Sequence, residues 1–280
     1  MPGQGHSPDN PNPFAAAVES LLGFWSDAGV DTAFEDAPVD RLAERVRARP
    51  TPPRAAAPPT PVSQPSVEVA ADISAAVAEA RRLAAEAPTL EALAEAIAAF
   101  DGCGLKFAGA RRAVFARGAP DAPVMIIGEG PGADEDVQGA PFVGRAGKLL
   151  DKMLVAAGLE SRVFITNTVF WRPPGNRTPT PDEQMICAPF VERAIALVSP
   201  KLLLLSGGAA AKSMLRRSEG ILSLRGRWFD WRSGDEALEL PAMPTLHPAF
   251  LLRQPGAKKR AWSDLLTLVE RLDRPERPHS

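Results

Sequence analysis

The sequence has few cysteines, no long apolar run and no excess of basic over acidic residues. Two cysteines among 280 residues cannot make a disulfide framework, which indicates a reducing compartment and predicts a cytoplasmic location. The longest apolar runs, such as Val124–Ile127 and Leu202–Leu205, are far shorter than the ~20 residues that span a bilayer, so we expect no membrane contact. The first residues have neither a basic start nor an apolar core, which predicts that they are not a secretion signal.

The formal net charge of −2 excludes a protein that is basic over its whole surface. Any binding to nucleic acid must therefore depend on a local basic patch. The content of 45% hydrophobic and 24% charged residues is typical of a globular protein.

Residues 1–73 are predicted to be a mostly disordered extension. Residues 50–66 are rich in proline and have no strand pattern, so they read as an extended linker. Residues 14–28 place apolar side chains at helical spacing and predict a short amphipathic helix. That helix either docks on the main domain or binds a protein partner, and both alternatives stay open. Residues 274–280 form a tail.

Residues 74–273 are predicted to form the main domain. Two helices come first, over 74–87 and 89–100, and Thr89 is suited to cap the second one. Strands and helices then alternate, which is typical of a three-layer α/β/α sandwich, with a central four-stranded parallel sheet. The expected strands are Val124–Gly128, Val163–Thr168, Leu202–Ser206 and a segment near Met243–Leu246; the expected helices are Arg145–Ala157, Pro181–Leu197, Ala209–Leu215 and Lys258–Leu272.

Three unusual segments follow strands, where parallel sheets bind their ligands. The first, at 128–136, is glycine-rich and then acidic. A dinucleotide-binding turn is disfavoured there because Pro131 lacks an amide and three acids follow, although an ordinary loop stays possible. Asn167 ends a buried strand, where its side chain either caps a turn or forms hydrogen bonds with the polar edge of a ligand. His247 follows the last strand and precedes a proline, which favours a pocket role over a structural one.

The segments GEGPGADEDVQGAPFVGRAGKLLDKML, ITNTVFWRPPGNRTPTPDE and LHPAFLLR resemble family 4 of the uracil-DNA glycosylases, the iron–sulfur, phage DNA polymerase-related branch. The resemblance runs from about residue 97 to residue 272 and keeps the motifs in order. It implies an α/β/α enzyme that flips uracil out of single- or double-stranded DNA, hydrolyses the N-glycosidic bond and so begins base-excision repair.

The resemblance also implies roles for individual residues. Glu129 and Gly130 frame the uracil and the attacking water, and Glu135 lies near uracil C5, where it helps exclude thymine. Phe142 stacks on the flipped base and Asn167 reads its N3/O4 edge. His247 contacts O2, where negative charge develops as the bond breaks. The resemblance leaves open which group positions the water: Glu129, Glu135 or a backbone carbonyl.

The segment after His247 suits a wedge that enters DNA. The expected wedge residues are Phe250, Leu251 and Leu252, and the basic residues expected to hold phosphates are Arg253, Lys258, Lys259 and Arg260. The alternative is a loop that enters a helix with a solvated basic face. The expected partner is uracil-containing DNA, bound by a monomer.

The family holds a four-iron cluster on four cysteines, and this chain departs from that pattern. The matching positions are Phe100, Cys103, Trp171 and Cys187, so two ligands remain and two are aromatic. We therefore expect no metal and no cofactor, with the two rings filling the vacated space. The rival hypothesis keeps a cluster through substitute ligands or a dimer. A disulfide between the two cysteines is disfavoured in the cytoplasm.

Two other functions are compatible with the sequence. One is a catalytically weakened relative that binds DNA or serves as a repair adaptor through its N-terminal helix. The other is a nucleotide-binding enzyme of the ordinary doubly wound type, which this chain fits poorly because it lacks a proper glycine fingerprint.

Overall fold

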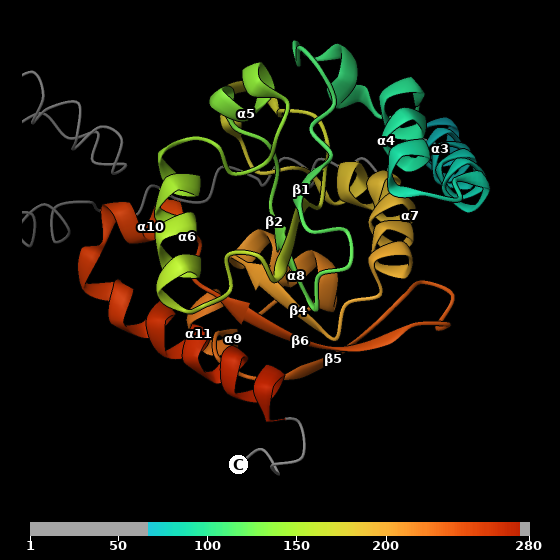
Figure 1. Ribbon diagram of the computed structural model, residues 1–280. Coiled ribbons are helices and arrows are strands. Elements are labelled where there is room, and N and C mark those ends of the chain that lie inside the picture. The colour runs from blue at the N-terminus through green and yellow to red at the C-terminus, as the bar shows by residue number, and fades with distance from the viewer. Residues whose placement is uncertain (1–66, 275–280) are drawn as a thin grey trace, which may run out of the picture. The chain divides into compact units, whose positions relative to one another are not determined.

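The computed structural model describes residues 67–274 (Figure 1). They form an α/β/α sandwich around one sheet. The expected amphipathic helix at 14–28 and the linker at 50–66 lie outside the described residues, as does the tail after residue 274. No helix of the described part is long and apolar enough to cross a membrane.

The sheet has six strands in the order β1-β3-β2-β4-β6-β5. The strands are β1 (Ala116–Gly118), β2 (Val124–Gly128), β3 (Val163–Asn167), β4 (Leu202–Ser206), β5 (Phe229–Arg232) and β6 (Glu239–Thr245). The four central strands run parallel, and β1 and β5 pair antiparallel with β3 and β6 at the two edges. The predicted central four-stranded parallel sheet is therefore confirmed, and the sheet has two further antiparallel strands at its edges that the sequence did not reveal.

The two edge strands were missed for physical reasons. β1 is three residues long, and β5 alternates exposed and buried residues, so neither has the continuous apolar run of a strand covered on both faces. β6 also begins earlier than expected, at Glu239. Pro241 and Pro244 interrupt its strand pattern, and Pro241 lies where β6 pairs with the edge strand β5.

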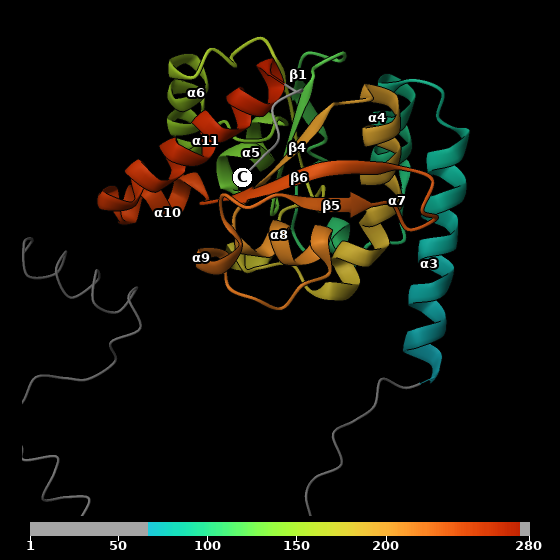
Figure 2. The ribbon, with the colours of Figure 1, turned by 90° about the horizontal axis from the view of Figure 1, so that it is seen from below.

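Helices cover both faces of the sheet, as Figures 1 and 2 show. The α-helices are α3 (Val67–Glu86), α4 (Leu90–Ala99), α5 (Ala133–Gln138), α6 (Arg145–Ala156), α7 (Pro181–Val198), α8 (Gly208–Leu215), α9 (Ile221–Leu224), α10 (Pro248–Arg253) and α11 (Lys258–Asp273). Short 3₁₀ turns lie at Gly104–Phe107, Pro174–Asn176 and Pro255–Ala257. The predicted cap of α4 is confirmed, since Thr89 Oγ1 accepts a hydrogen bond from the N–H of Ala92 at 3.2 Å.

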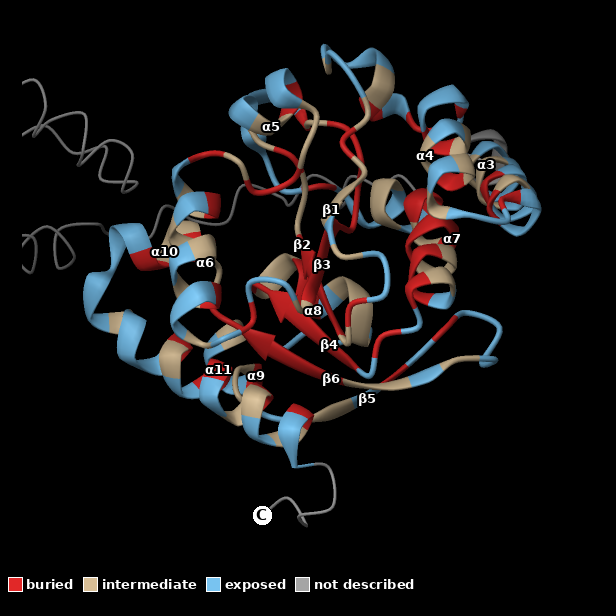
Figure 3. Cartoon of the chain, viewed as in Figure 1, coloured by how far each residue is buried: buried red, intermediate tan, exposed pale blue. Residues whose placement is uncertain are grey.

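Alternate residues of each central strand supply two separate cores. On one face, Met125 and Leu203 pack with residues of α3, α4 and α7. On the other face, Ile126 and Leu204 pack with α6 and α11. β2, β3 and β4 are buried throughout, and the carboxyl half of β6 is buried as well, as the red strands of Figure 3 show. Side chains at the carboxyl ends of these strands are therefore held by a rigid support.

Candidate active site

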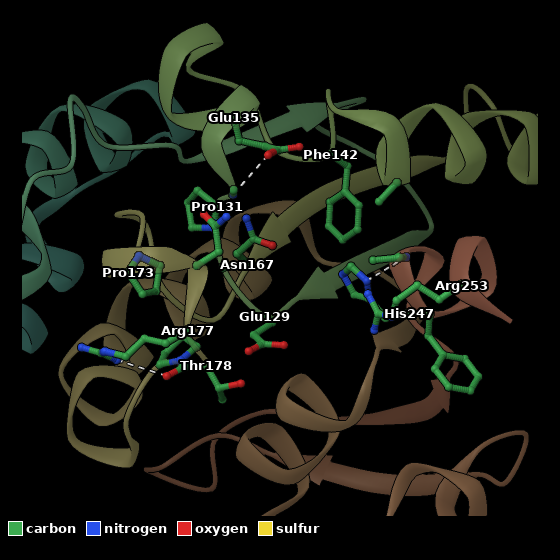
Figure 4. A pocket seen from close by; sticks show the side chains of 17 residues that line it. Glu129, Pro131, Glu135, Phe142, Asn167, Pro173, Arg177, Thr178, His247 and Arg253 are labelled. Carbon is green, nitrogen blue, oxygen red and sulfur yellow. Dashed lines mark hydrogen bonds between the residues drawn. The ribbon is translucent and has the colours of Figure 1, made fainter. Parts of the chain in front are cut away.

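The carboxyl ends of the central strands open into a pocket of about 510 Å³ (Figure 4). Its walls come from the loop after β2, the end of β3, the proline-rich loop after β3 and the segment after β6. The pocket brings together all six residues expected to contact or act on a base: Glu129, Gly130, Glu135, Phe142, Asn167 and His247. Segments more than a hundred residues apart in the chain thus meet at one site.

Phe142 lies in the loop between α5 and α6 with φ of 54°, in the left-handed region. For a bulky residue such a conformation costs about 1–3 kcal/mol and persists only when its surroundings enforce it. A Cβ on Gly147 would lie 1.6 Å from the carbonyl oxygen of Phe142, so glycine is required there. A Cβ on Gly128 would lie 2.6 Å from the Phe142 ring, which therefore rests directly on the end of β2.

Asn167 is the last residue of β3 and pairs in register with Gly128. Its side chain is 1% exposed. Its Oδ1 approaches Gly128 closely, because a Cβ there would lie 2.4 Å from that atom. No hydrogen bond within residues 67–274 engages its amide, so both the donor and the acceptor of this group are available to a ligand.

His247 precedes α10 and caps it. Its Nδ1 accepts a hydrogen bond from the N–H of Ala249 at 3.1 Å. Burial lowers the pKa of His247 to about 4, and the nearby positive charge of Arg253 adds to this effect. The ring is therefore neutral at pH 7. Because Nδ1 accepts, the single proton of the neutral ring is on Nε2, which becomes a hydrogen-bond donor.

The rings of Phe142 and His247 lie close together and tilted. Their centroids are 5.6 Å apart and their planes make an angle of 31°. Gly207 also lies against His247, since a Cβ there would meet Cβ of His247 at 3.0 Å. An aromatic face, an amide edge and an imidazole N–H thus surround one space, in which Figure 4 shows the side chains converging.

The carboxylate of Glu135 is occupied by backbone groups. Its Oε1 accepts hydrogen bonds from the N–H groups of Val143 and Gly144, both at 3.0 Å. Its Oε2 accepts one from the N–H of Gly132 at 3.1 Å. Glu129 differs, because no hydrogen bond of the described residues engages its carboxylate, while its backbone carbonyl accepts one from Thr168 Oγ1 at 2.6 Å. Its side chain lines the pocket.

The proline-rich loop after β3 forms a wall to which the sequence analysis assigned no role. Pro173, Arg177 and Thr178 line the pocket there. Arg177 is held by Glu183, with contacts of 2.6 and 2.9 Å. The dense run of prolines after a buried strand was the available signal, because it predicts a rigid loop where a ligand binds.

A family model described as the uracil DNA glycosylase superfamily matches residues 115–266. The chain belongs to the uracil-DNA glycosylase superfamily. It is 38% identical over 171 residues to the type-4 uracil-DNA glycosylase of Sulfurisphaera tokodaii, a stretch covering 59% of this chain and 77% of that protein. It is 39% identical over 142 residues to the enzyme of the same name from Thermotoga maritima, covering 50% of this chain and 71% of that protein. It is 40% identical over 147 residues to the enzyme of the same name from Pyrobaculum aerophilum, covering 51% of this chain and 74% of that protein.

The segment that follows His247 in this glycosylase-superfamily chain is a helix, α10, rather than a simple loop. Phe250 and Arg253 line the pocket, and Leu252 is 37% exposed. Leu251 is fully buried against Leu246 and Ala261, so its expected place in a wedge was wrong. Its position three residues after Pro248, which is also buried, puts it on the inner face of the helix. The remaining basic residues of this segment, Lys258, Lys259 and Arg260, are exposed on the first turn of α11.

The four positions that match the family's cluster ligands lie in one core of this superfamily member. Phe100, Cys103, Trp171 and Cys187 are each at most 3% exposed. The thiols of Cys103 and Cys187 contact each other and form no disulfide, and this contact, together with burial, raises the pKa of the Cys187 thiol. No group of three or more potential ligand residues is found among residues 67–274.

Aromatic rings fill the space around the two thiols. Phe100 packs edge-on against Phe190 at a centroid distance of 5.2 Å, and Phe170 packs against both Phe190 and Trp171 at 6.2 and 6.3 Å. Two cysteines and two aromatic rings do not fit a cluster that takes four thiolates.

Proposed function

We propose that this protein is a uracil-DNA glycosylase, which extrudes uracil from DNA and hydrolyses the bond between N1 of the base and C1′ of the sugar. The observation that carries the proposal is the convergence of Phe142, Asn167 and a neutral His247 on one pocket. A base inside a duplex is out of reach, so it must first be flipped at a cost of a few kcal/mol.

The pocket is suited to hold and identify a flipped uracil. The Phe142 ring offers a stacking surface, and the unengaged amide of Asn167 offers a donor for O4 and an acceptor for N3–H. Cytosine has an amino donor at C4 and an acceptor at N3, so it would pair poorly with the same amide orientation. Glu135 is placed near C5 in this proposal, where the loop that it braces leaves less room for a thymine methyl group.

His247 stabilises the leaving group. When the glycosidic bond breaks, the electron pair stays on the base and negative charge accumulates on O2. A neutral imidazole whose Nε2–H is fixed by the contact of Nδ1 with Ala249 meets that charge without reorganisation. Water then adds its hydroxide part to C1′, and its proton is transferred to the departing base or to solvent.

Glu129 is the better candidate to position the attacking water. Its carboxylate faces the pocket without a hydrogen bond from the described residues, whereas three backbone N–H groups already use that of Glu135. A carboxylate also stabilises positive charge on the sugar during bond breaking.

The segment that follows His247 is proposed to contact DNA. Phe250 and Leu252 are the remaining candidates for the wedge, and Arg253, Lys258 and Lys259 are the candidates for phosphate contacts. We further infer that the protein works without an iron–sulfur cluster, because carbon rings occupy two of the four ligand positions. The monomeric state stays a prediction. The cytoplasmic location and a protein partner of the N-terminal helix stay predictions.

The test is base excision from oligonucleotides that contain uracil or thymine at one position, followed by alkali to cut abasic sites. The expected result is cleavage that requires uracil and is lost in His247→Ala and Asn167→Ala. Thr166→Val is a matched control. Thr166 precedes Asn167 in β3, so its side chain lies on the opposite face of the sheet, where its hydroxyl donates a hydrogen bond to the carbonyl of Phe115. Tight binding of uracil-containing DNA without cleavage would instead identify a repair adaptor.

A further inference from the structure

The loop that carries Phe142 is held from β1, an edge strand that has no contact with the pocket. Arg117 of β1 donates a hydrogen bond from Nε to the carbonyl of Pro141 at 2.8 Å. Its Nη2 donates to the carbonyl of Phe142 at 3.2 Å. The guanidinium thus holds two consecutive carbonyl groups, one on each side of the Phe142 Cα.

The same guanidinium is also fixed by a carboxylate. Nη2 also contacts Oδ1 of Asp151 in α6 at 2.6 Å. The Arg117 side chain is 29% exposed and that of Asp151 is 46% exposed. Arginine suits this task because its planar fork binds several acceptors in a fixed geometry, whereas lysine is a point charge on a flexible stem.

Glu135 accepts hydrogen bonds from the N–H groups of Val143 and Gly144, and the first of these belongs to the same peptide group as the Phe142 carbonyl that Arg117 binds. Between these two contacts lies the left-handed backbone of Phe142, with φ of 54°. Arg117 therefore binds the carbonyls that precede and follow the strained residue, and Glu135 binds the amides beyond it.

We infer that Arg117 is a positioning residue for base excision, which keeps the Phe142 ring in its stacking position before DNA arrives. This inference rests on the proposed function, since it assigns Phe142 the stacking of uracil. Without the guanidinium, the two carbonyls lose their donor and the backbone of Phe142 relaxes toward an ordinary φ. The ring then shifts from its place on Gly128.

The experiment measures single-turnover excision of uracil and inhibition by free uracil, which reports on the pocket alone. Arg117→Met is expected to lower the rate by about 10-fold to 100-fold, in line with the effect of misplacing a contact by about 1 Å. Inhibition by free uracil should weaken in parallel, whereas affinity for DNA without uracil should be unchanged. Arg117→Lys, which keeps the charge and the fold, should recover only part of the loss.

The matched control is Arg162→Met. Arg162 forms an ion pair with Asp273 at the same 2.6 Å, with side-chain exposures of 35% and 46%, and lies outside the pocket. Arg162→Met should lower the stability no more than the loss of any surface ion pair does, and it should leave the rate of excision unchanged. The melting temperature of every variant shows whether it is folded.

A second measurement separates positioning from general support. In a Phe142→Ala background, Arg117→Met should change the rate by less than about threefold, because the two substitutions remove the same contact. An equal loss in both backgrounds would overturn the inference, as would an unchanged rate in Arg117→Met. A wild-type chain that excises no uracil would overturn the proposed function and this inference together, whereas the other two results leave the proposed function standing.

Discussion

The rate of uracil excision between pH 5 and pH 8 tests whether His247 acts as a neutral imidazole. Burial, with a contribution from Arg253, lowers the pKa of His247 to about 4, compared with about 6.5 for a free histidine. Protonation at Nδ1 would also set an N–H against the N–H of Ala249, which now donates to that atom. The neutral ring is therefore the form that both caps α10 and donates from Nε2.

The neutral fraction of a histidine is 1/(1 + 10^(pKa − pH)). With a pKa of about 4, about 90% of the rings are neutral at pH 5. With a pKa of about 6.5, only about 3% would be neutral at that pH. The expected rate at pH 5 is therefore nearly that at pH 8, whereas an unshifted histidine would give about a 30-fold loss.

The assay is single-turnover excision from a strand that carries one uracil among thymines, so that no cytosine or adenine in the substrate titrates. His247→Gln serves as the control, because its amide still donates but does not titrate. It should be slower and equally flat with pH. A drop in the wild-type rate centred near pH 6.5, absent in His247→Gln, would refute a neutral buried ring.

The same pKa shift affects stability in a defined direction. The unfolded chain binds a proton on this histidine near pH 6.5, whereas the folded chain binds it only near pH 4. The unfolded state thus holds more protons within this window, so the free energy of unfolding falls as the pH is lowered through it. Circular dichroism at each pH confirms that the protein in the assay is folded.

Two further predictions concern the wedge and the thiols. Leu251→Ala should lower the free energy of unfolding by about 2–5 kcal/mol, because Leu251 is fully buried, whereas Leu252→Ala should change it by no more than about 0.5 kcal/mol. Equal effects in chemical denaturation would contradict the inward placement of Leu251. Protein purified without oxygen should contain no stoichiometric iron, and Cys103 and Cys187 should react with a thiol reagent only after unfolding. One cluster's worth of iron and sulfide would refute the carbon-filled core.

The parallel centre of the sheet could be predicted because burial on both faces leaves an apolar run with few alternatives. Val124–Gly128 and Leu202–Ser206 have the bounds that were expected from their sequences. The edge strands β1 and β5 could not be found in this way. Their residues are paired on one side only, so their pattern is that of ordinary surface segments.

The convergence of the pocket residues was predictable from the rule that parallel strands end at one edge of the sheet. The hydrogen-bond partners of the individual pocket residues could not be predicted in this way. The contacts of Glu135 with Val143 and Gly144 depend on the path of the loop at 139–144, and the hydrogen bond to His247 depends on a helix that begins at Pro248. A proline one residue after a capping side chain is a helix-start signal, and it was available in the sequence.

The bare backbone of Gly128 has a consequence for how this protein could lose its activity. Both the Asn167 amide and the Phe142 ring lie within 2.6 Å of the point where a Cβ would be. One added methyl group would thus push the Asn167 amide and the Phe142 ring apart, without touching the basic residues of α10 and α11. Such a protein would still fold and hold DNA, and it would shield damaged sites instead of opening them to repair.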